Sequence, residues 1–399
     1  MIGLNRRTFG SLISYALDHE LWIEAGMIFG PLESYCNARG FTEEADAWAN
    51  RIRLATEDAT GTPPDIDSRA GMLWMAAADA QASRQCARFQ LGPANATYQQ
   101  MRVLLEAHPA QEKWQAHLTA VYHGIGTIAL LEGRLDDAEE WYRQSLAIKE
   151  QLGDTEGRAT IYCQLGVIAR DRGRLHDAEA WYHKALIILE KLGDKILIAK
   201  AYNALGAITY LQARLDEAED WYSKAFTINE EIGNKPELAM NYHQQGLVVR
   251  KRGRVDDSEE WIRKSLAIEE ELGNKHGIAA SYHELGNTAY AQARFDDAEN
   301  WYYKALKIHE QLGDTSGIIK AFTQLSSLAG KRGRAGQELE WTVRWVTVFD
   351  EFPHPLTRPG PENLATLAKH LGIGALEETW LRVTGKPLPQ TVREYVEHD

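Results

Sequence analysis

With 399 residues, the chain is too long to fold around one compact core, so the sequence predicts several domains or an array of repeats. Its 44 basic and 57 acidic residues leave a net charge of -13, which argues against a general binder of nucleic acid or of an anionic membrane, because phosphate groups attract a basic surface. Cys36, Cys86 and Cys163 are widely spaced and odd in number, so the sequence predicts neither a disulfide framework nor a zinc knuckle, and we expect a reducing cytoplasm.

The apolar residues do not form a membrane anchor. No apolar run approaches the roughly 20 residues that a membrane helix needs. Arg6 and Arg7 precede an apolar run that Ser and Tyr interrupt, without a small-residue cleavage site. We therefore expect a soluble protein.

Residues 1–116 are predicted to hold N-terminal helices and two degenerate repeats. Gly40, Ala45 and Ile52 keep a spacing that recurs farther along the chain, and Gly92 lies 41 residues before Gly133. The connector between the two degenerate repeats is predicted at residues 59–68, ATGTPPDIDS, which are rich in Pro, Gly and Asp.

Residues 117–350 are predicted to form six repeats with a period of 40 residues. Five segments align without a gap, from GRLDDAEEWYRQSLAIKEQLGD at Gly133 to ARFDDAENWYYKALKIHEQLGD at Ala293, and a decayed sixth copy begins at Gly333. One apolar stripe at helical spacing consists of Ala138, Trp141, Ser145, Ile148 and Leu152. The preceding and following segments complete two antiparallel helices of about 17 residues per repeat, which must stack because neither buries its apolar face alone.

The ends of these helices carry recognisable signals. Asp136 and Asp137 occupy the predicted N-cap and first turn, where negative charge is favoured, and Gly153 stands where a left-handed residue ends the helix. Residues that can cap the next helix are Asp154, Asn234 and Asn274.

The spaced small and aromatic positions resemble those of a tetratricopeptide repeat (TPR): Tyr162, Leu165, Gly166, Gly173, Ala178, Tyr182 and Ala185. The length of the repeat is similar to the 40-residue subtype of kinesin light chains and many bacterial regulators. The resemblance implies an all-α, right-handed superhelical solenoid of stacked antiparallel helix pairs, whose concave side binds a protein or peptide. Residues 6–48 resemble the helical region that precedes the repeats in bacterial STAND-type signalling ATPases, but no phosphate-binding G-x-x-x-x-G-K-[ST] motif is present.

Residues 351–399 are predicted to cap the C-terminal end of the array. Four prolines in residues 351–361 interrupt helicity, and three short helical segments follow. Trp380 and Leu381 are the predicted anchors of this cap, which would cover the last apolar face. The competing use of the same segment is an oligomer interface.

The candidate binding residues lie on the first helix of each repeat, opposite its packing face. Corresponding positions form three series: His123, Cys163, Asn203, His243, His283 and Thr323; Gly124, Gln164, Ala204, Gln244, Glu284 and Gln324; Thr127, Val167, Ala207, Leu247, Asn287 and Ser327. The residues at these positions vary between repeats, while those at the packing positions recur. Such variation is expected of a surface that is shaped for one ligand. Drift on a neutral surface would look similar.

A basic rim recurs in every second repeat. Arg170, Arg250 and Lys331 alternate with Tyr210 and Tyr290, and an acidic partner segment would suit such a rim. The alternative is that these basic residues only interact with the helix dipole.

Chemistry other than binding is not predicted. His123, His243 and His283 belong to different stacked repeats, whereas the ligands of one zinc ion must lie within roughly 2.3 Å of it. Cys163 has no identifiable acid to orient a nucleophilic pair. The sequence therefore predicts no catalytic residue, no metal and no cofactor, and an enzyme would need a compact domain that it does not contain.

Two series that recur at every repeat are assigned to structure. The tryptophans at 141, 181, 221, 261, 301 and 341 are predicted to be core. The arginines from Arg134 to Arg334 are predicted to form ion pairs that fix the turns and the stacking, with glutamates five residues on, from Glu139 to Glu299.

Two functions fit these patterns. The leading one is a cytoplasmic bacterial recognition module, either a free adaptor or the sensor part of a signalling assembly. The alternative is a peptide-responsive regulator that resembles quorum-sensing receptors, in which residues 1–60 act as the effector.

Overall fold

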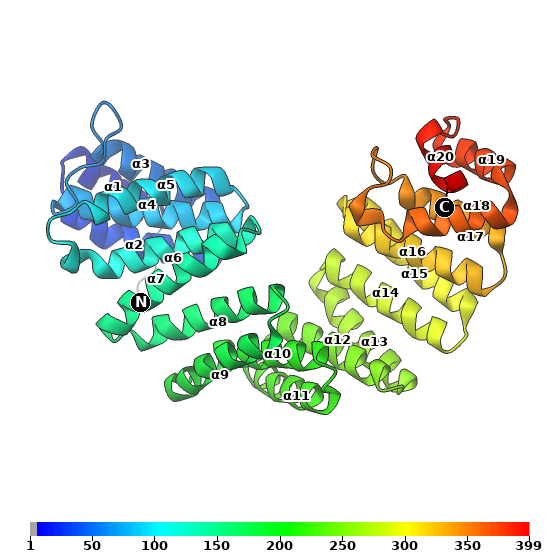
Figure 1. The fold of residues 1–399 in the computed structure, drawn as a ribbon. Coiled ribbons are helices and arrows are strands. Elements are labelled where there is room, and N and C mark those ends of the chain that lie inside the picture. The colour runs from blue at the N-terminus through cyan, green and yellow to red at the C-terminus, as the bar shows by residue number, and fades with distance from the viewer. Residues whose placement is uncertain (1–5, 399) are drawn as a thin grey trace. The chain divides into compact units, whose positions relative to one another are not determined.

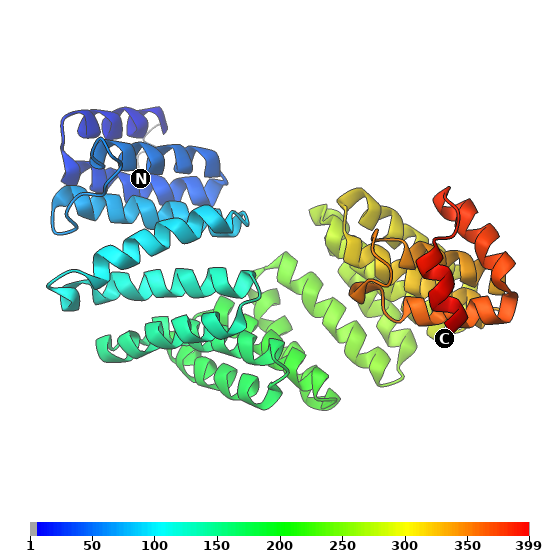
Figure 2. The same cartoon turned by 45° about the horizontal axis from the view of Figure 1, so that its top comes forward.

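A computed structural model describes residues 6–398, and every regular element in that range is a helix (Figure 1). The described residues form 20 α-helices in sequential antiparallel pairs, which confirms the predicted all-α class. The chain divides into two compact units, residues 1–194 and residues 195–399. Within each unit, consecutive helices lie side by side (Figure 2).

The helices of the first unit cover the N-terminal region and the first two regular repeats. Their bounds are α1 (Arg6–Asp18), α2 (Trp22–Arg39), α3 (Thr42–Thr56), α4 (Arg69–Ala87), α5 (Leu91–Glu106), α6 (Gln115–Leu131), α7 (Leu135–Leu152), α8 (Thr155–Asp171) and α9 (Leu175–Leu192). A short 3-10 helix, Gln111–Trp114, precedes α6. The predicted connector at residues 59–68 contains no helix.

The second unit holds the remaining repeats and the C-terminal helices. Their bounds are α10 (Lys195–Leu211), α11 (Leu215–Ile232), α12 (Lys235–Lys251), α13 (Val255–Leu272), α14 (Lys275–Ala291), α15 (Phe295–Leu312), α16 (Thr315–Lys331), α17 (Ala335–Val346), α18 (Gly360–Leu371), α19 (Ile373–Thr384) and α20 (Gln390–His398). We call α6, α8, α10, α12, α14 and α16 the first helices of the repeats, and α7, α9, α11, α13, α15 and α17 the second helices.

The ends of the repeat helices follow the predicted signals except at one position. Gly153 ends α7 in the left-handed region with φ 68, and Asp154 Oδ1 accepts a hydrogen bond from Gly157 N at 2.8 Å. The prediction of an N-cap at Asp136 is wrong, because α7 begins one residue earlier and its N-cap is Arg134, which makes no side-chain capping bond. Asp136 therefore acts only through its charge in the first turn.

In four of the six repeats, the helix pair packs around a glycine of the first helix and a tyrosine ring of the second. A Cβ atom added to Gly166 would lie 2.6 Å from Cε2 of Tyr182, and one added to Gly286 would lie 2.5 Å from Cε1 of Tyr302. Only glycine permits this approach, because real Cβ atoms do not come so close to a ring.

The recurring tryptophans are half-buried rather than fully buried. Trp181 stacks on Tyr162 with the ring centroids 5.6 Å apart, and the Lys184 ammonium lies 4.3 Å from the Trp181 centroid. The tryptophans thus cover the edge of the core, because one part of the indole packs on the repeat and another meets a solvated lysine.

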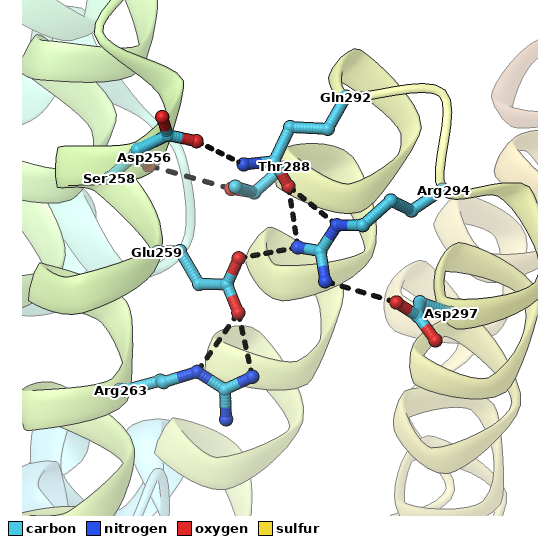
Figure 3. Close-up of polar contacts among 8 residues, drawn as sticks. All are labelled: Asp256, Ser258, Glu259, Arg263, Thr288, Gln292, Arg294 and Asp297. Atoms are coloured by element: carbon cyan, nitrogen blue, oxygen red, sulfur yellow. Dashed lines mark hydrogen bonds and ion pairs between the residues drawn. The ribbon is translucent and has the colours of Figure 1, made fainter.

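The recurring arginines join consecutive repeats. Arg294 at the start of α15 forms an ion pair with Glu259 of α13, which belongs to the preceding repeat (Figure 3). Glu259 also accepts from Arg263 of its own helix at 2.7 Å. The predicted ion pairs therefore exist, but the glutamate belongs to the repeat before the arginine and does not lie five residues after it.

The three C-terminal helices form a small core with α17. Trp380 is buried there, with an exposed fraction of 5%, as predicted for an anchor. The prediction for Leu381 is wrong, because its side chain is 54% exposed and is not among the residues of this core. Assembly through this segment stays a prediction, as does the division of the chain at residues 116 and 350.

None of the helices in the described part of the chain is both long enough and apolar enough to cross a membrane.

Candidate functional site

The predicted binding residues lie on the first helices, and most of them are half-buried. In the first unit, His123 lies on α6, and Cys163 and Gln164 lie on α8. Burial raises the pKa of the Cys163 thiol to about 11, so the thiol stays protonated at neutral pH and is a poor nucleophile.

In the second unit, tyrosines of the second helices hold several of these side chains in place. The Tyr222 hydroxyl donates to Gln244 Oε1 at 3.3 Å, and the Tyr302 hydroxyl donates to Asn287 Oδ1 at 2.9 Å. Leu247 and Gln324 are half-buried on the same first helices. The packing tyrosines therefore orient the amides of the predicted surface.

One pocket of about 310 Å³ brings together three of the predicted residues, His243, His283 and Glu284. We call it the histidine pocket. Four further side chains from α14, α15 and α16 and from the turn before α16 complete it: His276, His309, Asp314 and Lys320. The pocket thus combines imidazoles, carboxylates and one ammonium group from three consecutive repeats.

The two carboxylates of the histidine pocket each have a partner, whereas its one ammonium group has none within the described residues. Arg250 Nη2 lies 2.9 Å from Glu284 Oε2, and His309 Nδ1 lies 2.8 Å from Asp314 Oδ2. Lys320 is exposed and has no ion pair within the range that the structure describes. A carboxylate brought by a ligand would therefore meet an unpaired cation.

Two imidazoles of this pocket are neutral at pH 7. Burial lowers the pKa of His243 and of His283, and the positive charge of Lys320 adds to the effect at His283. His283 Nδ1 is buried without a hydrogen-bond partner in the described residues. A neutral imidazole with a free ring nitrogen can bond an amide group of a ligand.

Gly317 makes room for His309. A Cβ atom added there would lie 2.0 Å from His309 Nδ1, while the Gly317 backbone N–H donates to Asp314 Oδ1 at 3.0 Å. The N-cap of α16 and the histidine therefore occupy one tightly packed corner of the pocket.

Sequence reasoning missed His309, although a signal for it was present. It belongs to a fourth variable series near the end of the second helices, formed by Lys149, Leu189, Asn229, Glu269 and His309. The other three series are variable positions on the first helices. The same comparison on the second helices identifies His309.

The predicted basic rim is largely neutralised within the protein. Arg170 lies 2.8 Å from Asp171, and Arg250 is bound to Glu284. The Tyr210 ring lies under the Lys251 ammonium at 4.3 Å. Among the three rim cations, Lys331 has no ion pair in the described part of the chain, and it lines a separate pocket with Tyr290.

Asn203 takes part in a buried chain of amides. Asn241 Nδ2 donates to Asn203 Oδ1 at 2.6 Å, and Asn229 Nδ2 donates to Asn241 Oδ1 at 2.8 Å. Asn203 is itself buried, so its side chain is engaged in packing α10 against α11 and α12.

Three possible metal ligands lie within 4.8 Å of one another in the described residues, Asp65, Asp67 and His108, and they are far along the chain from the predicted surface. Lys113 already forms an ion pair with Asp67 there. Within the described range, the histidines of the histidine pocket do not form a group of three possible metal ligands at that spacing.

Family models match the regular repeats. Residues 105–264 match the MalT-like TPR region, and residues 237–311 match a tetratricopeptide repeat model. The two matches together cover more than half of the chain. No curated protein matches the chain by sequence.

Solved structures of similar fold include regulators and a sensor. The quorum sensor NprR from B. thuringiensis is 10% identical with a TM-score of 0.61, and the likeness covers 96% of this chain and 98% of that one. A Rap protein complexed with competence and sporulation factor is 12% identical with a TM-score of 0.57, over 97% and 98% of the two chains.

A STAND protein with a TPR sensor from Pyrococcus horikoshii is 16% identical with a TM-score of 0.59, over 89% of this chain and 54% of that one. The present chain thus spans about half the length of that protein. At such identities the likeness concerns the fold alone. From the matched repeat models and the antiparallel helix pairs, we conclude that the chain belongs to the tetratricopeptide repeat family.

Proposed function

We propose that the chain is a non-catalytic recognition module that binds an extended peptide, or an extended segment of a partner protein, on the first helices of its second unit. The observation that carries this proposal is the histidine pocket, where side chains from three consecutive repeats surround a space of about 310 Å³. A cytoplasmic location agrees with Cys36, Cys86 and Cys163, which form no disulfide in the described residues.

The chemistry of the pocket favours a peptide backbone with a nearby carboxylate. His283 offers a buried ring nitrogen without a partner, and a backbone amide can satisfy it. Lys320 at the edge can pair with an acidic side chain of the same peptide. The Arg250–Glu284 pair leaves no net charge at the base, so we assign the preference for acidic segments to Lys320 rather than to the predicted rim.

Selection from a displayed library of random peptides, with the full chain as bait, provides the test. The affinity of a labelled selected peptide is then measured by fluorescence anisotropy. We expect His283→Ala and Lys320→Met each to raise the dissociation constant roughly tenfold, the cost of one lost hydrogen bond to a charged or buried group.

The matched control is His176→Ala, because His176 is exposed on α9 and lies outside the pocket. Helicity and melting temperature are recorded for each variant, so that loss of binding is separated from loss of fold. Unchanged affinity in both pocket variants would refute the assignment of the histidine pocket.

A second candidate is a peptide-responsive regulator whose N-terminal helices act as the effector. It is supported by the likeness to the quorum sensor NprR, which extends over 96% of this chain. A groove of about 530 Å³ between α2 and α4, lined by Trp22, Phe29 and Leu73, gives these helices an apolar surface for a further contact. Small-angle X-ray scattering with and without the selected peptide tests it, since an effector role requires a changed profile.

A further inference from the structure

A second pocket lies where the last repeat meets the C-terminal helices. It has a volume of about 430 Å³ and is lined by residues of α14, α16, α17 and α18 and of the segment before α18. We call it the junction pocket. Its function does not follow from the histidine pocket, because the two pockets share no lining residue.

The junction pocket arises from substitutions that are confined to the last repeat. Thr342 stands where the other repeats have tyrosine or, at Ile262, isoleucine, so the side chain at this position is smaller in the last repeat. Glu338 stands where the other repeats have alanine or serine, and Gly330 stands where they have leucine, arginine or tyrosine. The exchange of small and large residues opens a space beside α16 and places a carboxylate in it.

The Glu338 carboxylate has no partner. It makes neither a hydrogen bond nor an ion pair within the described residues, and burial raises its pKa. A Cβ atom added to Gly330 would lie 2.6 Å from Glu338 Oε1, so the carboxylate rests against the last turn of α16. A partly desolvated carboxylate without a cation is costly and marks a place for one.

Trp345 is also specific to the last repeat and also lacks a partner. Serine or alanine occupies its position in the other repeats, from Ser145 to Ala305. The Trp345 side chain is 2% exposed, and its Nε1–H has no acceptor in the part of the chain that the structure describes. If the end of the array only needed apolar cover, an indole with an unpaired donor would be a poor choice.

Lys331 supplies the third unpaired group. It follows Gly330 in the chain and lines the same pocket as Glu338, but none of its contacts brings its ammonium within 4.0 Å of that carboxylate. A cation and an anion thus line one pocket without pairing to each other. A ligand that carries both charges on adjacent atoms can neutralise them together.

We propose that the junction pocket binds a free α-amino acid. Glu338 receives the α-ammonium group, Lys331 and the Trp345 Nε1–H receive the α-carboxylate, and Tyr290 and Leu367 provide an apolar wall for the side chain. A neutral sugar would leave both charges unpaired, and an internal peptide segment has neither terminal charge.

Isothermal titration of the full chain tests this proposal with L-leucine, L-phenylalanine, N-acetyl-L-leucine, L-leucinamide and glucose. We expect saturable binding of at least one of the two free amino acids. The blocked derivatives each lack one charge, so we expect them to bind that pocket roughly 10- to 100-fold more weakly than the free amino acid. Absence of amino acid binding at millimolar concentration, equal binding of the blocked forms, or binding of glucose instead would overturn the proposal.

Three variants locate the binding. Glu338→Gln, Lys331→Met and Trp345→Phe are expected to raise the dissociation constant of the amino acid, the first two by roughly tenfold or more. Glu310→Gln is the matched control, because Glu310 is an exposed carboxylate on the neighbouring α15. Trp345→Phe alters a buried ring, so its melting curve is recorded as well. If this variant unfolds, the conclusion rests on Glu338→Gln and Lys331→Met.

The amino acid and peptide proposals are tested independently. His283→Ala leaves the junction pocket intact, so it should bind the amino acid with unchanged affinity even if peptide binding is lost or was never present. Unaltered amino acid affinity in both Glu338→Gln and Lys331→Met would mean that another site binds it, and the junction pocket would be rejected.

Discussion

Arg254, the N-cap residue of α13, lies 3.0 Å from Glu219 of α11, so the start of one second helix is tied to the second helix of the repeat before it. Arg174 and Glu139 form the same contact at 3.0 Å in the first unit, and Arg294 and Glu259 repeat it in the second. Arg252 also pairs with Glu219. Each glutamate thus receives arginines from the next repeat, and the contact fixes the spacing between repeats.

A double-mutant cycle should show that this contact contributes little energy by itself. Both side chains are partly exposed, at 44% and 29%, so we expect a coupling energy between Arg254→Ala and Glu219→Ala of at most about 1 kcal/mol. Urea unfolding at low salt and in 1 M NaCl provides the measurement, and the coupling should shrink at high salt because of screening. A salt-independent coupling above about 2 kcal/mol would contradict the description as a solvated pair.

The close approach within a repeat should be far more sensitive to substitution. In Gly286→Ala the new methyl group meets the Tyr302 ring at 2.5 Å, and we expect a loss of about 1–3 kcal/mol from overpacking. Gly336→Ala is the control on α17, where no atom lies within 4 Å, and it should be neutral or stabilising by up to about 1 kcal/mol. Equal effects of the two substitutions on urea unfolding would show that the tyrosine contact is not tight.

The repeat architecture could be predicted because its packing positions recur at a fixed period. Gly166 and Tyr182 appear in corresponding positions of several repeats, so one interpretation of their contact applied to all of them. The sequence could not show that Arg254 pairs with Glu219 of the preceding repeat. The 40-residue period would be the same if each arginine paired with the glutamate of its own repeat.

The pockets were harder to predict than the repeats. His243 and Lys320 are 77 residues apart in the chain and line one pocket only when three consecutive repeats are packed. Whether a basic residue is free also depends on its neighbours, as Arg250 shows, since Glu284 lies 34 residues farther along the chain and neutralises it. The variable series therefore identified the surface, while the unpaired groups on it required the structure.

The buried amide chain should make Asn241 a sensitive position. In Asn241→Ile, Asn203 loses a donor and Asn229 loses an acceptor, and two unsatisfied buried groups should cost about 2–4 kcal/mol. In the double variant Asn241→Ile with Asn229→Leu, apolar side chains replace both amides of this hydrogen bond, so no buried donor is left unpaired at position 229. We expect this double variant to be less destabilised than the sum of its single changes in urea unfolding. Simple additivity would mean that the amides do not act as a unit.

The histidine pocket should make the stability of the second unit depend on pH. Burial lowers the pKa of His243 and His283 below the ordinary value of 6.5, while Glu284 opposes the shift and Arg250 strengthens it at both histidines. The unfolded chain then binds more protons than the folded chain once the pH falls to about 6.5. The stability contributed by the two neutral imidazoles is therefore complete above that pH and is lost as the pH falls through the lowered folded-state pKa.

The comparison of wild type with His243→Gln/His283→Gln isolates this contribution from that of other titrating groups. We expect the wild-type protein to lose more free energy of unfolding between pH 7.5 and pH 5.5 than the double variant does, because glutamine does not titrate. His176→Gln, an exposed histidine on α9, should behave as the wild type. If the double variant lost as much stability as the wild type over this range, the two histidines would have to be solvated, and the pocket would lack the neutral imidazoles on which peptide binding is proposed to depend.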